Sequence, residues 1–351
     1  MDEKFIFVTG ASGEIGHGLL KSFHSKHAER VVALDLNPLD PQLEELCHTF
    51  FQGDLLDRAL LARIWKRFSI GTVYHLASIL SSHAESDPGL AHRVNVEGTM
   101  DLLQHAVNQG LALGKAIKFI YPSSIAVYGI PDLQTKEVSG CVSEEKLCTP
   151  RTMYGCNKLY CEQVGRYYSK HYRHFPQGAN QGGIDFRALR FPGLVSADTV
   201  PTGGTSDYGP EMVHHAARGL AYRCFVREDS QLPFMAMPDA ITALLTLEAA
   251  PIEVLSREVY NVTSFSLTAR EFQTNILQHF PELEVTYEVD SGRQAIVDSW
   301  PADIDDSAAR RDWGWRPNLD RHETFSDYLV PAVRLHYERK VGLTAKPDPA
   351  K

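Results

Sequence analysis

The sequence lacks the features that would direct it to a membrane or to a nucleic acid. No apolar run approaches the ~20 residues that a membrane helix needs, and the longest candidate, Ala240–Leu255, is broken by Glu248, Pro251 and Glu253. The 35 basic residues are outnumbered by 44 acidic ones, and no sustained basic run occurs, so a polyanion would be repelled. The start MDEKFIFVTG has neither the basic residues nor the apolar core of a signal peptide. We therefore expect neither a membrane nor a nucleic acid as a partner.

The sequence also lacks the spacings of a metal site. Its six cysteines form no CxxC pair and no zinc pattern, so we expect free thiols, a reducing compartment and a cytoplasmic protein. His75, His83, His214 and His215 have no ligand spacing either. We predict that they are solvated or lie on helix surfaces, and that the protein holds no metal.

What the sequence does have is an alternation of short apolar runs and helical patterns over its first 175 residues. Near-continuous apolar strands between helices indicate a parallel sheet that is covered on both faces. We predict an α/β protein with a Rossmann-type, doubly wound sheet in residues 1–190, a smaller substrate-binding lobe in 191–339 with segments that return to the sheet, and a flexible tail in 340–351. The polar segment 173–183 is predicted to be a loop. The predicted strands are Phe5–Thr9, Val31–Leu34, Thr72–His75, Ile117–Tyr121 and Ile184–Leu189, and the predicted helices are Ile15–His27, Leu60–Phe68, Gly89–Asn108 and Arg151–Tyr172.

A glycine-rich turn joins the first strand to the first helix. In VTGASGEIG, Gly10, Gly13 and Gly16 would let the backbone approach a pyrophosphate at the helix N-terminus. Asp35 ends the second strand about 20 residues further on, where an acid hydrogen-bonds the adenosine ribose and repels a 2′-phosphate. NAD is therefore favoured over NADP. Asp54 follows the third strand, and it is predicted either to contact adenine or to cap the next helix.

A candidate catalytic group lies further along the chain. Tyr154 and Lys158 are four apart on a predicted helix, which places both side chains on one face. An ammonium beside a phenol is expected to lower the pKa of the tyrosine toward neutrality, so that Tyr154 acts as a general acid or base. Ser123 and Ser124 come just past the end of the predicted strand Ile117–Tyr121, where open α/β sheets bind ligands.

The motifs GASGEIG, HLAS, RVNVEGT, SSIAVYG, YGCNK and RFPG resemble the extended short-chain dehydrogenase/reductase family, also described as NAD-dependent epimerases/dehydratases. The resemblance implies a catalytic triad of Ser124, Tyr154 and Lys158, with Asn95 in support. It implies that Lys158 also binds the nicotinamide ribose and that Pro192 lies near the nicotinamide. It further implies a homodimer through the helices Gly89–Asn108 and Arg151–Tyr172. The remaining cofactor contacts that it implies are Ser12, Glu14, Ile15, Leu55, Leu76 and Ala77.

The segment PTGGTSDYGPE resembles a loop in the short-chain type of L-threonine 3-dehydrogenases, as do LPFMAMPDAI, SWPADIDDSAARRDWGW and ASILSS. This resemblance implies NAD-dependent oxidation of the secondary hydroxyl of L-threonine to 2-amino-3-ketobutyrate. The hydroxyls and backbone N–H groups suit a carboxylate, and Asp207 suits an ammonium or caps the following helix. Three alternatives stay open: a nucleotide-sugar 4-epimerase, a dehydrogenase of another small hydroxy acid such as erythronate, and a non-catalytic NAD sensor. Besides Ser124 and Tyr154, the predicted substrate-binding residues are Ser81, Gly204, Thr205, Ser206, Asp207 and Trp300.

Overall fold

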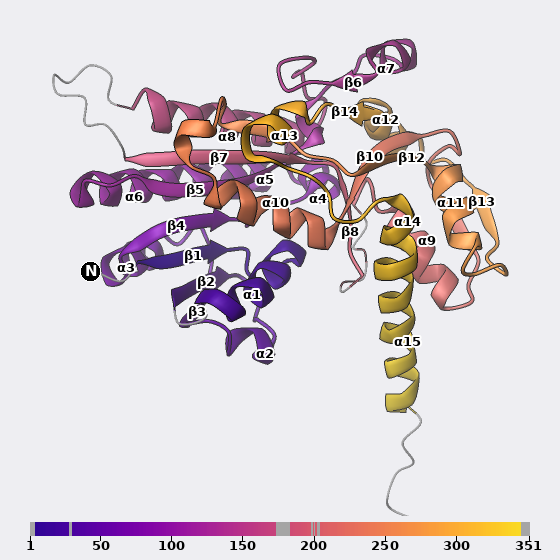
Figure 1. The fold of residues 1–351 in the computed structure, drawn as a ribbon, viewed down its shortest axis with the longest axis horizontal. Coiled ribbons are helices and arrows are strands. Elements are labelled where there is room, and N and C mark those ends of the chain that lie inside the picture. The colour runs from indigo at the N-terminus through magenta and orange to yellow at the C-terminus, as the bar shows by residue number, and fades with distance from the viewer. Residues whose placement is uncertain are drawn as a thin grey trace, which may run out of the picture.

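A parallel sheet forms the centre of the structure, which is a computed structural model that describes residues 4–27, 30–172, 183–197, 199, 201 and 204–344 (Figure 1). Every neighbouring pair of its seven strands runs parallel. The chain changes direction between β1 and β4, which creates the switch point at which such sheets bind ligands. In spatial order the strands are β11 (Val259–Asn261), β7 (Ile184–Phe191), β5 (Ile117–Ser124), β4 (Ile70–His75), β1 (Phe5–Thr9), β2 (Val31–Asp35) and β3 (Thr49–Gln52).

Helices cover both faces of this sheet because successive strand residues point to opposite sides. Val8 packs in one apolar cluster with helices of the first face, and its neighbour Phe7 packs in another with helices of the second face. The predicted α/β, doubly wound fold is thereby confirmed. The helices of the first face are α1 (Glu14–His27), α10 (Met237–Ala249) and α13 (Ser307–Trp313), and those of the second are α3 (Arg58–Arg67), α6 (Gly98–Leu113) and α8 (Met153–Lys170).

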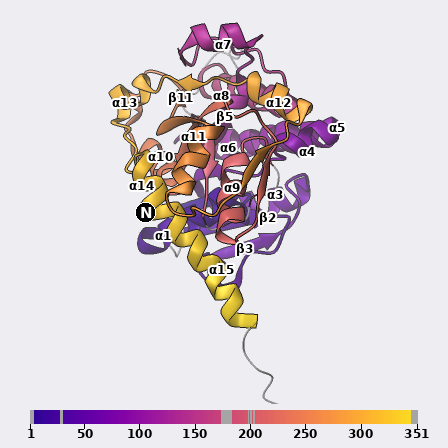
Figure 2. The same cartoon turned by 90° about the vertical axis from the view of Figure 1, so that its right-hand side faces the viewer.

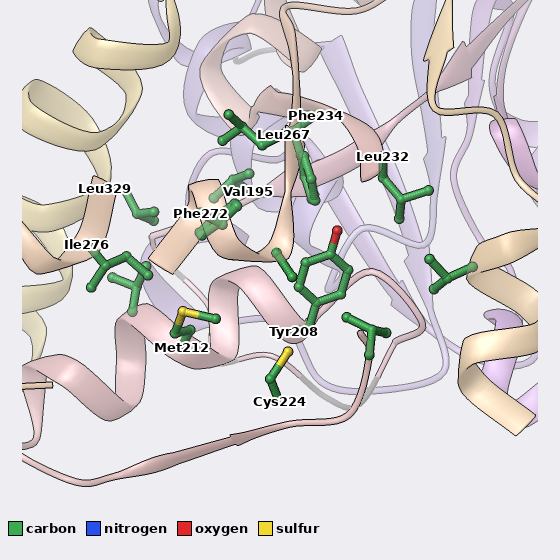
Figure 3. Packing of buried hydrophobic residues seen from close by; sticks show 14 of the residues in the cluster. Val195, Tyr208, Met212, Cys224, Leu232, Phe234, Leu267, Phe272, Ile276 and Leu329 are labelled. Carbon is green, nitrogen blue, oxygen red and sulfur yellow. The ribbon is translucent and has the colours of Figure 1, made fainter. Parts of the chain in front are cut away.

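A second lobe is built around its own apolar cluster, in which Tyr208, Phe234 and Phe272 pack edge to face (Figure 3). Its main sheet has the order β12-β10-β8, and β9 pairs with β13. The elements of this lobe are β8 (Gly193–Val195), α9 (Tyr208–Ala217), β9 (Tyr222–Cys224), β10 (Gln231–Ala236), β12 (Phe265–Thr268), α11 (Ala269–Leu277), β13 (Val285–Tyr287), α12 (Ser291–Asp298), η5 (Thr324–Leu329) and α15 (Val330–Thr344).

Shorter elements join the longer helices and strands, and α7 and α15 lie at opposite ends of the molecule (Figure 2). Among the described residues, no helix is both long and apolar enough to cross a membrane. The connecting elements are α2 (Pro41–Glu44), α4 (Ser81–Ser86), α5 (Pro88–His92), η2 (Arg93–Glu97), η3 (Ile125–Val127), α7 (Leu133–Ser139), β6 (Cys141–Val142), η4 (Ile252–Val254), β14 (Asp303–Ile304) and α14 (Arg321–Glu323).

The structure differs from the sequence-based prediction at several boundaries. The predicted helix 89–108 is interrupted by the π-helical turn η2, because one wider turn there carries Asn95. β5 continues to Ser124, since its last residues still pair with β7. α15 continues to Thr344, into the segment that the sequence predicts as a tail. Residues 173–182 of the predicted loop and 345–351 of the tail lie outside the described residues.

Candidate functional site

The glycine turn between β1 and α1 is shaped for close approach of another backbone or ligand. Gly10 has φ +73°, and a Cβ there would lie 2.4 Å from the amide nitrogen of Ala77. A Cβ on Gly16 would lie 2.4 Å from the carbonyl oxygen of Ala11. Glycine is therefore required at both positions on steric grounds. The turn delivers the chain into α1, whose first N–H groups have no carbonyl partner within the helix and so attract an anion.

Asp35 stands beside this turn at the carboxyl end of β2. Its Oδ2 accepts a hydrogen bond of 2.9 Å from the backbone amide of Ser12, and its Oδ1 accepts one of 2.9 Å from Asn37. These bonds hold the carboxylate against the turn, as a ribose-binding acid requires. Asp54 is exposed and accepts from the amide of Leu56 at 2.9 Å. The next helix is capped by Asp57 instead, so the prediction that Asp54 caps it is wrong.

Asn95 fixes the segment that follows β4. Its amide group exchanges hydrogen bonds with the backbone of Ile79, at 2.7 Å to the N–H and 3.0 Å to the carbonyl. It also accepts from the Ser78 hydroxyl at 3.2 Å and donates to Asn157 on α8 at 3.3 Å. Asn95 thus links the strand end to the helix that carries Tyr154. Of the other predicted cofactor residues, Leu76, Ala77 and Leu55 lie at strand ends of the same sheet edge, and Glu14 accepts from the hydroxyl of Thr199.

The predicted triad meets where β5 ends against α8. The Ser124 hydroxyl lies close enough to the phenol of Tyr154 to affect its ionisation. Lys158 lies on the same helix face, with Nζ 5.5 Å from the centre of the Tyr154 ring and 2.7 Å from the carbonyl oxygen of Pro122, to which it donates. Thr152 caps α8 through the amide of Gly155 at 3.0 Å, which starts the helix just before the tyrosine.

In the protein chain, burial has the largest effect on the pKa values of Tyr154 and Lys158. It raises the pKa of Tyr154 above the usual value for a phenol, and the interaction with the Ser124 side chain only partly offsets this. Burial also lowers the pKa of Lys158 to about 8. The expectation that the lysine brings the tyrosine near neutrality is therefore wrong for the chain by itself, because Nζ is engaged by a backbone carbonyl and water is excluded from both groups.

Two of the four histidines are buried rather than solvated, and that part of the prediction is wrong. His75, 1% exposed on the central strand β4, lies between the hydroxyls of Thr9 at 2.7 Å and Thr99 at 2.8 Å. Burial lowers the pKa of His75 to about 3, so the ring stays neutral. His214 is buried against Tyr337, with Nδ1 3.0 Å from the phenol oxygen. Within the described ranges, no three potential metal ligands gather.

A pair of hydroxyls joins the predicted substrate loop to the first lobe. Thr205, 2% exposed, donates to the Ser81 hydroxyl at the start of α4 at 3.1 Å. Asp207 accepts from the amide of Gly204 at 2.6 Å and makes no capping bond to α9, so the capping alternative is wrong. Ser206 packs beside Gly193 of β8. Thr202 and Gly203 lie outside the described residues.

Trp300 belongs to the apolar cluster of the second lobe. It is 5% exposed, and its indole N–H has no hydrogen-bond partner among the described residues. Tyr154 packs against the same cluster, which also contains Tyr208 at the end of the loop. The cluster thus connects the predicted catalytic tyrosine to the predicted substrate loop, with Trp300 as part of the core behind them.

The sequence analysis misses one charged residue of this region, Glu162, which pairs with Arg190. Arg190 is 1% exposed and is engaged by Glu162, so it is not available to a ligand. Glu162 was not singled out, although its position four residues after Lys158 puts it on the same face of α8. Arg293 donates to the carbonyl oxygen of Gly204 at 3.1 Å and stacks on Phe225.

Comparisons with known proteins agree with this arrangement. The model of the NAD-dependent epimerase/dehydratase family matches residues 6–263. The mitochondrial L-threonine 3-dehydrogenase of Bos taurus is 35% identical over 93% of this chain and 82% of its own. A solved monomeric L-threonine 3-dehydrogenase from a metagenome is 34% identical over 95% of this chain and 99% of its own, with a TM-score of 0.82. The solved L-threonine dehydrogenase of Phytophthora infestans is 32% identical over 96% and 100%, also with a TM-score of 0.82.

Proposed function

Because the chain belongs to the NAD-dependent epimerase/dehydratase family and is an NAD-dependent oxidoreductase, we propose that it oxidises the secondary hydroxyl of L-threonine to 2-amino-3-ketobutyrate. The observation that carries this proposal is the meeting of Ser124, Tyr154 and Lys158 where β5 ends against α8, beside a loop that Thr205 anchors to Ser81. The similarity to L-threonine 3-dehydrogenases over almost the whole chain supports the choice of substrate.

The residues at the sheet edge fit NAD. Gly10 and Gly16 leave room that a Cβ would fill, and Asp35 presents a carboxylate beside the turn. In this proposal Ser12, Gly13, Glu14, Ile15, Asp54, Leu55, Leu76, Ala77, Asn95, Lys158 and Pro192 complete the cofactor site. Bound NAD supplies the acceptor for the hydride that leaves C3 of threonine.

Side chains of the protein remove the proton of the substrate hydroxyl. Tyr154, as phenolate, removes that proton while Ser124 donates a hydrogen bond that orients the same oxygen. In this proposal the ammonium of Lys158, 5.5 Å from the ring centre of Tyr154, stabilises the negative charge of the phenolate, against the larger opposing effect of burial. Since burial opposes ionisation of Tyr154, oxidation is expected to become faster as the pH rises.

The loop supplies groups that match both charges of the amino acid. The hydroxyls of Ser81 and Ser206 provide donors for the carboxylate. Thr205 and Gly204 hold this site in place, because the Thr205 hydroxyl donates to Ser81 and the Gly204 amide donates to Asp207. Asp207 provides a carboxylate for the ammonium. Trp300 supports this site as apolar core rather than by polar contact.

The test is NADH formation, followed by absorbance, after the protein is mixed with NAD and one substrate at a time. L-threonine is compared with L-allo-threonine, D-threonine, L-serine, erythronate and UDP-galactose, and Tyr154→Phe serves as the matched control. We expect NADH with L-threonine and none with the variant, although the variant still binds NAD. NADH with erythronate alone would move the substrate to a sugar acid, and conversion of UDP-galactose without net NADH would indicate an epimerase. If the protein binds NAD but forms neither NADH nor any other product with any of the substrates, the non-catalytic NAD sensor would be favoured.

The nucleotide-sugar alternative receives no support from Arg190 or Arg223. Arg190 is buried in an ion pair, and Arg223 lies on the surface, 78% exposed beside Glu288. A diphosphate needs convergent cations, and these two do not converge.

The homodimer and the cytoplasmic location are also part of this proposal. Tyr160 and Tyr167 of α8 are about half exposed, as an interface on this helix would require. The mass of the protein in solution, measured by light scattering, checks the assembly. A monomeric L-threonine 3-dehydrogenase is among the related solved structures, and the bovine relative is mitochondrial, so a monomer mass would contradict the first part of this proposal and recovery in mitochondria on cell fractionation would contradict the second.

A further inference from the structure

A buried ion pair lies directly behind the predicted triad. Glu162 on α8 and Arg190 on β7 have side chains that are 0% and 1% exposed. The guanidinium binds both carboxylate oxygens, with Nε 2.9 Å from Oε1 and Nη2 2.7 Å from Oε2. Glu162 follows Lys158 by one helical turn and Tyr154 by two, so all three side chains share one face of α8. The pair therefore sits on the helix face that carries the chemistry.

The same carboxylate also binds the strand that ends in Ser124. The hydroxyl of Ser123 donates to Oε1 of Glu162 at 2.6 Å. In the register of the sheet, Ser123 is opposite Arg190, and Ser124 is opposite Phe191. Glu162 thus holds the ends of β5 and β7 to α8 at one point, one residue away from the hydroxyl that contacts Tyr154.

The surrounding groups balance the buried charges. Arg190 donates from Nη1 to the phenol oxygen of Tyr128 at 3.0 Å and to the carbonyl oxygen of Glu144 at 2.7 Å. The Glu144 carboxylate is in turn paired with Arg257 at 2.9 Å. The carboxylates of Glu162 and Glu144 are thus each paired with a different guanidinium. Apolar residues of similar volume often stabilise a core as well as such pairs do, so stability alone does not account for this arrangement.

We propose that Ser123 and Glu162, with Arg190 as counter-ion, are positioning residues for the oxidation. They set the Ser124 hydroxyl against the Tyr154 phenol by fixing the end of β5 relative to α8. This inference rests on the proposed function, because it assigns Ser124 and Tyr154 to the reaction. It adds residues that touch neither substrate nor cofactor and that act through Ser124.

The first test is Ser123→Ala, which removes one hydroxyl and leaves the ion pair in place. We expect kcat to fall about 10-fold, since small displacements of reacting groups carry penalties of this size. KM for threonine and the Kd for NAD should stay within about 2-fold, because neither site is contacted. In a Ser124→Ala background the same substitution should cost nothing further in kcat, because the residue through which it acts is gone. A purely structural role predicts the same loss in both backgrounds.

The second test replaces the ion pair with apolar residues, as Glu162→Met together with Arg190→Met. The matched control is Asp185→Leu with Arg187→Met, because Asp185 and Arg187 form a similarly buried pair on the same strand, with Nη2 2.6 Å from Oδ2. Asp185 is opposite Lys118, near the start of β5, far from Ser124 along the strand. We expect the first double variant to lose at least about 10-fold in kcat and the control to keep wild-type kcat, whatever either does to the melting temperature.

The outcomes separate the inference from the function that it rests on. Activity in Tyr154→Phe would refute the proposed function itself. Loss of activity in Tyr154→Phe together with unchanged kcat in Ser123→Ala and in the Glu162/Arg190 double variant would overturn only the positioning role. Equal kcat losses in the site and control double variants would overturn it as well.

Discussion

Ser81 and Thr205 are 124 positions apart in the sequence, yet their hydroxyls are joined at 3.1 Å in a buried contact. Ser81 begins a helix of the first lobe, and Thr205 lies in the loop that leads into α9 of the second lobe. This contact is where the described part of the predicted substrate loop meets the cofactor lobe. The loop's position therefore depends on both lobes.

Replacing Thr205 with Val tests that contact, since the two side chains have nearly the same shape. The substitution removes the donor to Ser81, and a lost hydrogen bond of about 1.4 kcal/mol corresponds to about a 10-fold rise in KM for threonine. The Kd for NAD should not change. Thr274→Val is the control, because its hydroxyl bonds only to its own helix on the exposed side of α11. Steady-state kinetics and NAD titration would decide; equal KM values for Thr205→Val and wild type would contradict the role.

Asp35→Asn tests the basis of cofactor choice. The amide keeps the size of the carboxylate but removes the charge that repels a 2′-phosphate. We expect the ratio of kcat/KM for NAD to that for NADP to fall by about 10-fold, equivalent to about 1.4 kcal/mol. Asp40→Asn, which alters a helix cap further along the same loop, should leave the ratio as it is. An unchanged ratio in Asp35→Asn would refute its ribose role.

Gly10→Ala tests the tight turn at the proposed pyrophosphate site. The new Cβ would lie 2.4 Å from the Ala77 amide nitrogen at a φ of +73°, so we expect a loss of about 2 kcal/mol or more in unfolding free energy and weaker NAD binding. Gly114→Ala has a similar φ of +61° but no atom within 4 Å of the new Cβ. It should cost only about 1 kcal/mol, from the backbone, and leave NAD binding intact. Urea unfolding and NAD titration compare the two; similar effects would show that the close approach to Ala77 is unimportant.

Because His75 is buried in its neutral form, we expect the free energy of unfolding to fall in mild acid. The unfolded chain binds a proton on this ring below pH 6.5, but the folded chain does so only near its lowered pKa of about 3. Stability should therefore fall by about 1.4 kcal/mol for each pH unit between 6.5 and 3 through this group. His75→Gln should reduce the loss between pH 6.5 and 5 by about 2 kcal/mol in urea unfolding. His83→Gln, at an exposed position of α4, is the control; an identical slope in His75→Gln and wild type would refute the assignment.

The local patterns of the sequence were sufficient for the sheet and the cofactor turn. Apolar strands, the spacing of Gly10, Gly13 and Gly16, and Asp35 at a strand end each depend on residues near one another in the chain. The fold class and the use of NAD, predicted from these patterns, are confirmed. The roles of Ser124, Tyr154 and Lys158 stay predictions, although the structure brings the three side chains together.

The partners of polar groups could not be obtained in the same way. From the sequence alone, Arg190 cannot be distinguished from an arginine that binds a ligand, but in the fold it is buried in an ion pair with Glu162. His75 resembles a surface histidine until the sheet places it between two threonines. The pKa of Tyr154 was expected to be lowered by Lys158, and burial raises it.

The sequence by itself thus determined the alternation of strands and helices in the first lobe, the glycine turn and the kind of cofactor, because steric limits and apolar periodicity act between neighbours in the chain. Only the tertiary structure decided which polar groups are buried away from water and which distant residue then forms their hydrogen bond. Thr205 bonds to Ser81 in this way, and Ser123 bonds to Glu162. The protonation and hydrogen bonding of a buried group depend on which protein partner takes the place of water. That partner is determined by packing between segments that are far apart in sequence.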